Sequence, residues 1–409
     1  MPMNNTHSNE RYSKTVNILL FLFPIGILNL KASGDLILFS LMLMGLYVVF
    51  TTKINPFKKT ELSLISWLTV TYFGVIILSI LMSDKPAELL HFANRDLHFL
   101  FAPLIAVAIY KANIDFDKLI LAIKLSLTLI GGYILYQHLI DGSVTDWRLS
   151  HGITPTLTMM MLIFSWINIS HENKYNLLLT AISSILAINL IIISAERGAF
   201  LVLIILSILF IFLNNKTTIH KNRNKMFVSI LTLVTIFLAL SNTHLINRFL
   251  DASKNVKEWS ADNKTTTQTS TSVIRLEMYK GGLLAAKERP LFGYGYRNTT
   301  TPASKFTSNE NLPHSISIYN HLHNTFINTL VFGGVIALTA VIALLFLPLT
   351  KFWRAFKTKN NTECAILGIL LTSGYILLSS TNGMLGGVAE NAFFVLFLSI
   401  LLPKVIKSK

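Results

Sequence analysis

Long apolar runs recur from one end of this 409-residue chain to the other, and their length decides what it can fold into. A helix needs about 17 to 25 apolar residues to cross a hydrocarbon core of roughly 30 Å. Backbone groups in hydrocarbon must be hydrogen-bonded within the protein, and runs of this length favour helices over strands. The pattern predicts an all-α, polytopic membrane protein with about twelve transmembrane helices.

The expected spans follow directly from these runs. The fourth is short, and we expect it to begin earlier, near His91, or to lie tilted. The ranges are 15–31, 34–51, 62–82, 99–110, 119–139, 153–170, 175–194, 198–213, 226–246, 321–349, 364–382 and 388–403.

Composition agrees with a membrane location. Hydrophobic residues make up 52% of the chain and charged residues 13%, whereas a soluble domain has roughly a quarter charged residues. The net charge of +15 could suggest nucleic acid, but in a membrane protein a basic balance usually reflects Lys and Arg kept on the cytoplasmic side. We therefore expect membrane lipid and no nucleic acid as a partner. The single cysteine, Cys364, excludes an internal disulfide.

The distribution of basic residues predicts the orientation, because Lys and Arg in short loops resist translocation. The first span follows a polar N-terminus without a cleavage site, which indicates an uncleaved helix. With both termini in the cytoplasm, more than half of the 35 Lys and Arg residues lie inside and few lie in the short outer loops. The inner clusters include Lys53, Lys58, Lys59, Lys216, Lys221, Arg223, Lys225, Lys351, Arg354, Lys357 and Lys359.

One long outer loop, 247–320, interrupts what we predict to be a single integral membrane domain, 1–409, between the ninth and tenth spans. Its first part, Lys254 to Ser272, is rich in Thr, Ser, Asn and Lys and is expected to be flexible. The next part, Ser272 to Lys287, has apolar residues at three- and four-residue steps, which predicts an amphipathic helix at the membrane surface. Pro290, Gly293 and Gly295 then predict a tight turn.

Two arginines are candidates for binding an anion. Arg197 separates two apolar runs so closely that its guanidinium must lie at the outer membrane face, where it could snorkel or hold phosphate oxygens. Arg275 lies within the apolar pattern of the loop helix, where a cation is costly unless it meets an anion. The alternative for Arg275 is a solvated helix face. Arg95 and Asp96 are expected in a loop, where either could contact a lipid headgroup, and Glu390 is expected to face the interior.

His323 and Asn324 open the tenth span, where free N–H groups and the helix dipole attract phosphate. A neutral histidine at such a position could act as a base, and the alternative is a capping or interfacial residue. No phosphate-loop, His-Glu-x-x-His or Cys-x-x-Cys motif is present in the sequence.

With these residues the chain resembles the O-antigen ligases of the O-antigen ligase and polymerase superfamily of bacterial envelope glycosyltransferases. The resemblance covers the whole topology, and four segments carry it most sharply. They are Glu196-Arg197-Gly198-Ala199-Phe200, Ile274-Arg275 through Tyr279, Pro290 through Tyr296, and His323-Asn324 followed by Gly333 and Gly334. Glu196 stands where the family usually has serine, and Ala337 replaces an expected glycine.

The resemblance implies a GT-C-like fold in the bacterial inner membrane and a glycosyltransferase that needs neither metal nor cofactor. The implied reaction transfers a glycan from undecaprenyl diphosphate to the lipid A-core oligosaccharide at the periplasmic face, with inversion. Arg197 and Arg275 would neutralise the diphosphate, and His323 would deprotonate or orient the acceptor hydroxyl. The implied substrate-binding residues are Asn324, Arg289, Tyr279, Gly293, Gly295 and His321.

Two alternatives use the same lipid-linked glycan. An O-antigen polymerase usually has two large outer loops with paired arginine motifs, whereas this chain has one, which favours the ligase. A flippase for lipid-linked glycans would be expected to show inverted repeats and ionisable groups at mid-membrane. No repeat is found, and the candidate residues gather on one predicted face.

Overall fold

The computed structural model describes residues 5–167, 174–215, 271–307 and 316–406, with a few single residues between 246 and 257. Within these ranges the chain is helical and has no strand, which confirms the all-α fold of a polytopic membrane protein. Ten of the described helices are long and apolar enough to cross a membrane. All but the last residue of the expected span at 226–246 and most of the Thr-rich stretch at 254–272 lie outside the described residues.

The first half of the chain forms helices joined mostly by short connections. Helix α4 and the 3-10 helix η1 continue into α5, so the fourth span runs from Pro86 to Lys111 and does begin before His91. Helix α7 has 13 residues and is shorter than the expected 153–170. The elements are α1 (Asn5–Asn29), α2 (Ser33–Thr52), α3 (Thr60–Leu81), α4 (Pro86–Leu89), η1 (Leu90–Asp96), α5 (Leu97–Lys111), α6 (Phe116–Asp141), α7 (Ile153–Ser165), α8 (Lys174–Ser194) and α9 (Arg197–Asn215).

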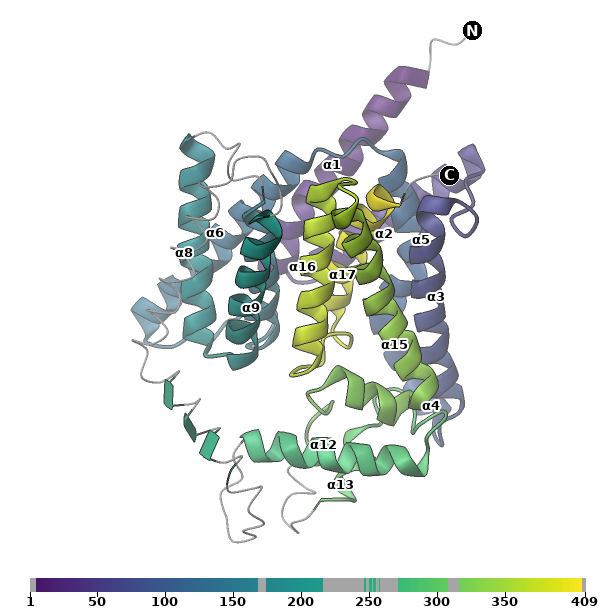
Figure 1. The fold of residues 1–409 in the computed structure, drawn as a ribbon, viewed down its shortest axis with the longest axis vertical. Coiled ribbons are helices and arrows are strands. Elements are labelled where there is room, and N and C mark those ends of the chain that lie inside the picture. The colour runs from purple at the N-terminus through teal and green to yellow at the C-terminus, as the bar shows by residue number, and fades with distance from the viewer. Residues whose placement is uncertain are drawn as a thin grey trace.

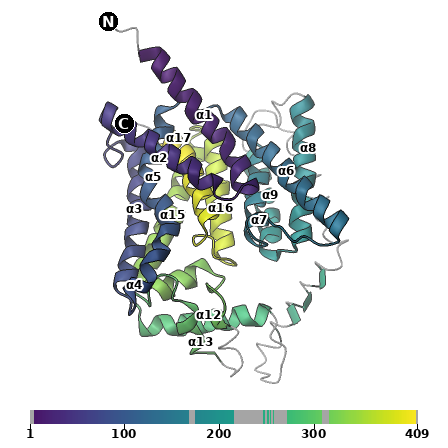
Figure 2. The ribbon, with the colours of Figure 1, turned by 180° about the vertical axis from the view of Figure 1, so that it is seen from behind.

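The second half adds a helix that lies across the end of the bundle. Figure 1 shows α12 (Thr271–Glu288) and α13 (Thr300–Ser304) at the end opposite to both chain termini. Figure 2 shows the same arrangement from behind, with the α1–α2 hairpin crossing the bundle obliquely. The remaining elements are α15 (Thr325–Lys357), α16 (Thr362–Ser379) and α17 (Val388–Val405).

Helix α17 is the centre of the bundle, since 83% of its span is buried. Lipid tails are as apolar as these side chains, so the helices associate through close packing. Aromatic rings from neighbouring helices supply much of that packing around α17. The ring centroids lie 5.0 Å apart for Phe164 and Phe397, 4.5 Å for Phe393 and Phe397, and 4.7 Å for Tyr375 and Phe394.

Interactions of α12 and the turn that follows it identify the connections that lie at this end of the bundle. Arg197 Nη2, at the start of α9, donates to Ser272 Oγ at 3.4 Å. Arg289 pairs with Asp84 of the α3–α4 connection at 2.8 Å, and Arg297 donates to the Gly386 carbonyl of the α16–α17 connection. Most of the residues singled out in the sequence therefore lie at one end of the molecule, which we call the α12 face.

Candidate active site

Helix α12 holds Arg275 against the α12 face by packing on its own following segment. The helix expected at Ser272 to Lys287 is present as Thr271–Glu288, with Ile274 and Met278 buried and Leu283 46% exposed. Its buried side thus faces protein, and few apolar side chains remain for the membrane surface. The small core beneath it consists of Ile274, Met278, Ala285, Ala286, Tyr294, Ala303, Ile316, Leu322 and Val331.

A break in α15 fixes the segment after α12 to the bundle. Gly334 has φ 64° and ψ −160°, a conformation that leaves the helix and that only glycine adopts readily. In an unbroken helix the Val335 N–H would donate to the Val331 carbonyl. Here the Val335 N–H and the Val331 carbonyl both form hydrogen bonds with the backbone of the 290–295 turn, which replace the missing helical bond. The bonds are Val335 N to Pro290 O at 2.8 Å, Tyr294 N to Val331 O at 2.9 Å and Gly295 N to Phe332 O at 2.8 Å.

One cavity of about 210 Å³ brings together the three residues expected to be catalytic, Arg197, Arg275 and His323. Arg197 is the first residue of α9, Arg275 comes from the first turns of α12, and His323 precedes α15. All three side chains are half-buried. Two guanidinium groups beside an imidazole suit a phosphate-bearing ligand, because guanidinium stays charged and binds phosphate oxygens in pairs.

His323 is held in an uncommon backbone conformation. Its φ is 52°, in the left-handed region that few residues other than glycine and asparagine adopt. The Tyr279 hydroxyl donates to its carbonyl at 3.0 Å, and its own N–H donates to His321 Nδ1 at 3.1 Å. The His323 ring meets the rings of Tyr319 and His321 edge-on, with centroids 5.4 and 4.3 Å away. Local contacts therefore fix this imidazole before any ligand binds.

Burial keeps both histidines neutral. Burial, together with the neighbouring His321 and Arg275, lowers the pKa of His323 to about 3. It likewise lowers the pKa of His321 to about 4, with Arg297 and Arg275 contributing. Since His321 Nδ1 accepts a hydrogen bond from an N–H, its proton is on Nε2. A bound phosphate would oppose these shifts, because an anion stabilises imidazolium.

His321 itself lines a second, much smaller cavity of about 30 Å³ beside the first. Arg297, Tyr296 and Asn328 also line this space. Its size suits a water molecule more than a substrate group. His321 therefore lies next to the Arg197–Arg275–His323 cavity, where it supports His323, and does not line that cavity.

The remaining residues predicted to bind substrate have structural contacts outside the cavity. Asn324 caps α15 by accepting from Ile327 N at 3.0 Å, and its amide donates to the Ser380 carbonyl at 3.1 Å. Tyr279 positions His323 as described. Arg289 pairs with Asp84 and lies 4.7 Å from the Tyr294 ring centroid, outside the residues that line the cavity. Gly293 and Gly295 belong to the turn that joins the broken α15, where a side chain on Gly293 would collide with the α15 backbone.

The cavity also contains residues that the sequence did not single out. His151, from the α6–α7 connection, lines it and pairs through Nδ1 with Glu196 Oε1 at 3.1 Å. Tyr319 lines it as well. A histidine just before an apolar run was the available signal for His151, but nothing in the sequence places that connection beside Arg197. Within the described ranges, no group of three or more His, Cys, Asp and Glu side chains is arranged to hold a metal.

Comparison with known proteins finds one family that matches part of the chain. Residues 182–342 match the family model described as O-antigen ligase. This segment belongs to the O-antigen ligase family. The O-antigen ligase segment contains Arg197, Arg275 and His323, so all three residues lie in the part of the chain that defines the match.

A similar protein carries the likeness beyond the O-antigen ligase segment. An "Uncharacterized protein" of Haemophilus influenzae is 24% identical over 399 residues, which cover 93% of this chain and 96% of that protein. At this coverage the match extends well beyond the O-antigen ligase segment of residues 182–342. The family supports a ligase- or polymerase-type transfer of envelope glycan.

Proposed function

We propose that this protein is an O-antigen ligase that transfers a glycan from undecaprenyl diphosphate to lipid A-core oligosaccharide. The observation that carries the proposal is the shared cavity of Arg197, Arg275 and His323 within the O-antigen ligase segment. A diphosphate is a good leaving group whose departure needs its growing negative charge to be stabilised. Two guanidinium groups aimed at one cavity supply that stabilisation.

In the proposed reaction the acceptor hydroxyl attacks the anomeric carbon on the side opposite the diphosphate. The new glycosidic C–O bond forms as the bond between that carbon and the diphosphate oxygen breaks, so the configuration inverts. Arg197 and Arg275 hold the leaving undecaprenyl diphosphate. His323, neutral in the free protein, orients the hydroxyl and takes its proton.

We further propose that the chain is one integral membrane domain with 247–320 as a periplasmic loop and both termini in the cytoplasm. The charge distribution supports this orientation, because the connections opposite the α12 face carry the Lys and Arg clusters. The α12 face is then periplasmic, where ATP is absent and the lipid-linked donor has to bring its own activation. Undecaprenyl diphosphate does so.

Transfer by the purified protein tests the proposal directly. Purified protein is mixed in detergent with lipid-linked O-antigen and lipid A-core, and the product is followed on gels. Arg275→Ala should lower the rate by about 10²- to 10³-fold, the usual effect of removing one charge-stabilising donor. His323→Ala should abolish transfer, and His323→Asn, which tolerates the left-handed backbone, separates loss of the imidazole from loss of folding.

Lys287→Ala is the matched control, since this exposed cation lies on the same helix as Arg275 and away from the cavity. Its rate should equal that of the wild type. Full activity of Arg275→Ala or His323→Asn would remove that residue from the mechanism. Absence of any glycan transfer with both lipids present would favour a flippase, which moves glycans without joining them, whereas joining of lipid-linked glycans to one another would favour the polymerase.

The deletion strain distinguishes ligase from polymerase. A strain without a ligase makes lipid A-core free of O-antigen, whereas one without a polymerase still attaches a single repeat. We expect bare core, and a single attached repeat would replace the ligase proposal by the polymerase.

A further inference from the structure

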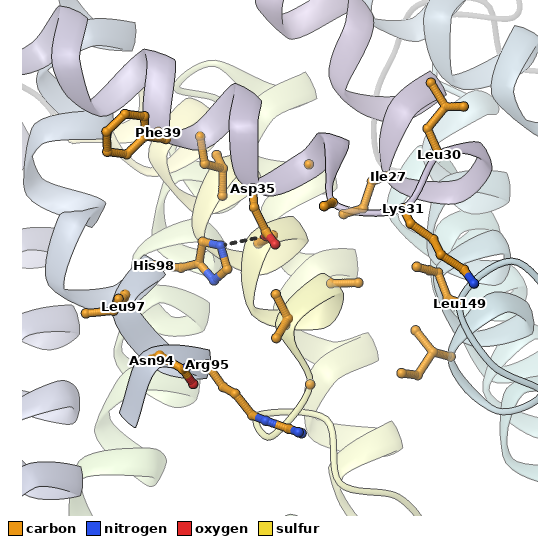
Figure 3. Close-up of a pocket in the computed structure, with 18 of the residues that line it drawn as sticks. Ile27, Leu30, Lys31, Asp35, Phe39, Asn94, Arg95, Leu97, His98 and Leu149 are labelled. Carbon is orange, nitrogen blue, oxygen red and sulfur yellow. Dashed lines mark hydrogen bonds and ion pairs between the residues drawn. The ribbon is translucent and has the colours of Figure 1, made fainter. Parts of the chain in front are cut away.

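A large cavity lies beside the candidate active site. It measures about 730 Å³, within the range of about 300–1,000 Å³ of small-molecule sites. Its lining comes from the α1–α2 hairpin, the end of η1 with the first part of α5, the α6–α7 connection and the start of α17. Figure 3 shows this space, which we call the hairpin cavity, with Lys31, Arg95 and the Asp35–His98 pair among its lining residues.

The hairpin cavity carries an excess of positive charge. Lys31, Arg95 and Arg148 line it, against the single carboxylate of Asp35. Asp35 is already engaged with His98 Nε2 at 3.0 Å. Lys31 comes from the α1–α2 connection, Arg95 from η1 and Arg148 from the α6–α7 connection, so their meeting at one cavity is a product of the fold and not of a local run of charge.

The three cations differ in the contacts that they make within the protein. Arg148 pairs with Asp146 at 3.2 Å and lies 4.0 Å from the Tyr133 ring centroid, so it is held in place. Lys31 and Arg95 are exposed, and the Arg95 guanidinium makes no hydrogen bond or ion pair with the residues that the structure describes. Two cations thus remain able to meet an external anion.

The other walls of the hairpin cavity are apolar and partly open to lipid. Ile27, Leu38, Phe101 and Ile105 line it. Leu30 and Phe39 also line it and are 62% and 50% exposed, so one side lacks a protein neighbour at the level of the spans. Apolar walls with cations at the rim suit a lipid whose headgroup carries phosphate. The acyl chains of such a lipid would lie along the apolar walls, and its phosphate would lie at the cations.

Two connections separate the hairpin cavity from the candidate active site. The α6–α7 connection places Arg148 in the hairpin cavity and His151 beside Arg197 and His323. The α16–α17 connection places Gly387 in the hairpin cavity, while Gly383 and Gly386 line the small cavity of His321. A headgroup bound at Lys31 and Arg95 would therefore lie on the far side of these connections from the arginines assigned to the donor.

We propose that the hairpin cavity binds the phosphorylated lipid anchor of the acceptor, a bisphosphorylated, acylated glucosamine lipid. The inference rests on the proposed function, which requires two lipid-anchored substrates at one centre. Arg197 and Arg275 hold the donor diphosphate, so a second cationic site on the other side of the α16–α17 connection serves the second substrate. Lys31 and Arg95 bind its phosphate, and the apolar wall takes the first part of its acyl chains.

Binding of lipid A to the purified protein, measured by native mass spectrometry in the absence of donor, tests this proposal separately from glycan transfer. Wild-type protein should bind lipid A saturably. Lys31→Gln combined with Arg95→Gln should weaken binding at least about tenfold, because each removes a charge-assisted contact. Ala389→Phe, which fills the cavity from α17, should weaken binding while leaving all charges in place.

The matched control combines Lys287→Gln with Lys305→Gln, two exposed lysines of the α12 face outside the hairpin cavity. It changes the net charge equally and should bind lipid A like the wild type. Equal binding by the Lys31/Arg95 variant, or equal binding of dephosphorylated lipid A, would overturn the proposal. Undecaprenyl phosphate displacing lipid A at equal concentration would also overturn it, since the site would then belong to the donor.

Kinetics separate the failure of this proposal from the failure of the proposed function. In the transfer assay the Lys31/Arg95 variant should show a raised KM for lipid A-core and an unchanged KM for the donor. A raised KM for the donor would contradict the assignment even if the protein is an O-antigen ligase. Saturable, charge-dependent binding of lipid A without any transfer would support this site while the proposed function failed.

Discussion

Replacing Gly293 by alanine should destabilise the protein, because this residue lies where the 290–295 turn joins the broken α15. The φ of Gly293 is 64°, and a left-handed conformation costs alanine about 1–2 kcal/mol. The added Cβ would also meet the backbone at Val331 and Phe332. The two hydrogen bonds that follow, from Tyr294 N and Gly295 N, contribute about 0.5–1.5 kcal/mol each. The free energy of unfolding should fall by about 2–5 kcal/mol.

Thermal unfolding of the purified protein in detergent measures this effect. We expect the Tm of Gly293→Ala to fall by several degrees and transfer to fall with it, since the turn holds α12 and Arg275. Gly132→Ala is the control, because nothing lies within 4 Å of a Cβ at Gly132 and alanine is the better helix former within α6. An unchanged Tm for Gly293→Ala would refute the claim that the turn is locked to α15.

Three further predictions concern the site. Burial lowers the pKa of His323 to about 3, so this imidazole is already neutral from about pH 5 to about pH 8. A plot of kcat/KM against pH should therefore show no loss of activity on the acid side of this range, and a loss with a midpoint near pH 6.5 would contradict the lowered pKa. Tyr279→Phe loses the 3.0 Å bond to the His323 carbonyl and should lower kcat several-fold while changing the free energy of unfolding by only about 0.5–1.5 kcal/mol, as denaturation curves would verify. Chelation with EDTA should leave the transfer rate unchanged, since Arg197 and Arg275 supply the positive charge; a loss restored by Mg²⁺ would disprove this.

Much of the fold could be predicted from the sequence because hydrocarbon imposes a simple rule on helix length. The positions of α2, α3, α6 and α8 follow from the apolar runs within a few residues. The early start of the fourth span was also expected from its short apolar run, and the structure has it at Pro86. Span length says nothing of packing, so the shortness of α7 and the central place of α17 could not be read in the same way.

The candidate site could be predicted only where the sequence places a charged residue at an energetically unfavourable position. Arg275 within an apolar pattern, and Arg197 between two spans, are expensive positions for a cation, and the structure places both beside His323. The backbone role of Gly293 was not predictable, because it depends on carbonyls that only the break at Gly334 exposes. His151 and the hairpin cavity were missed for the same reason, since both arise where distant connections meet.

The joint between the 290–295 turn and α15 also determines how this protein can be recombined with its relatives. Main-chain atoms make the hydrogen bonds between the turn and the part of α15 around Gly334, so this joint depends on the backbone conformation of both segments. A chimaera that exchanges α12 together with the turn, but not α15, would pair one parent's turn with the helix break of the other parent. Exchange of residues 271 to 335 as one cassette keeps both halves of the joint from the same parent.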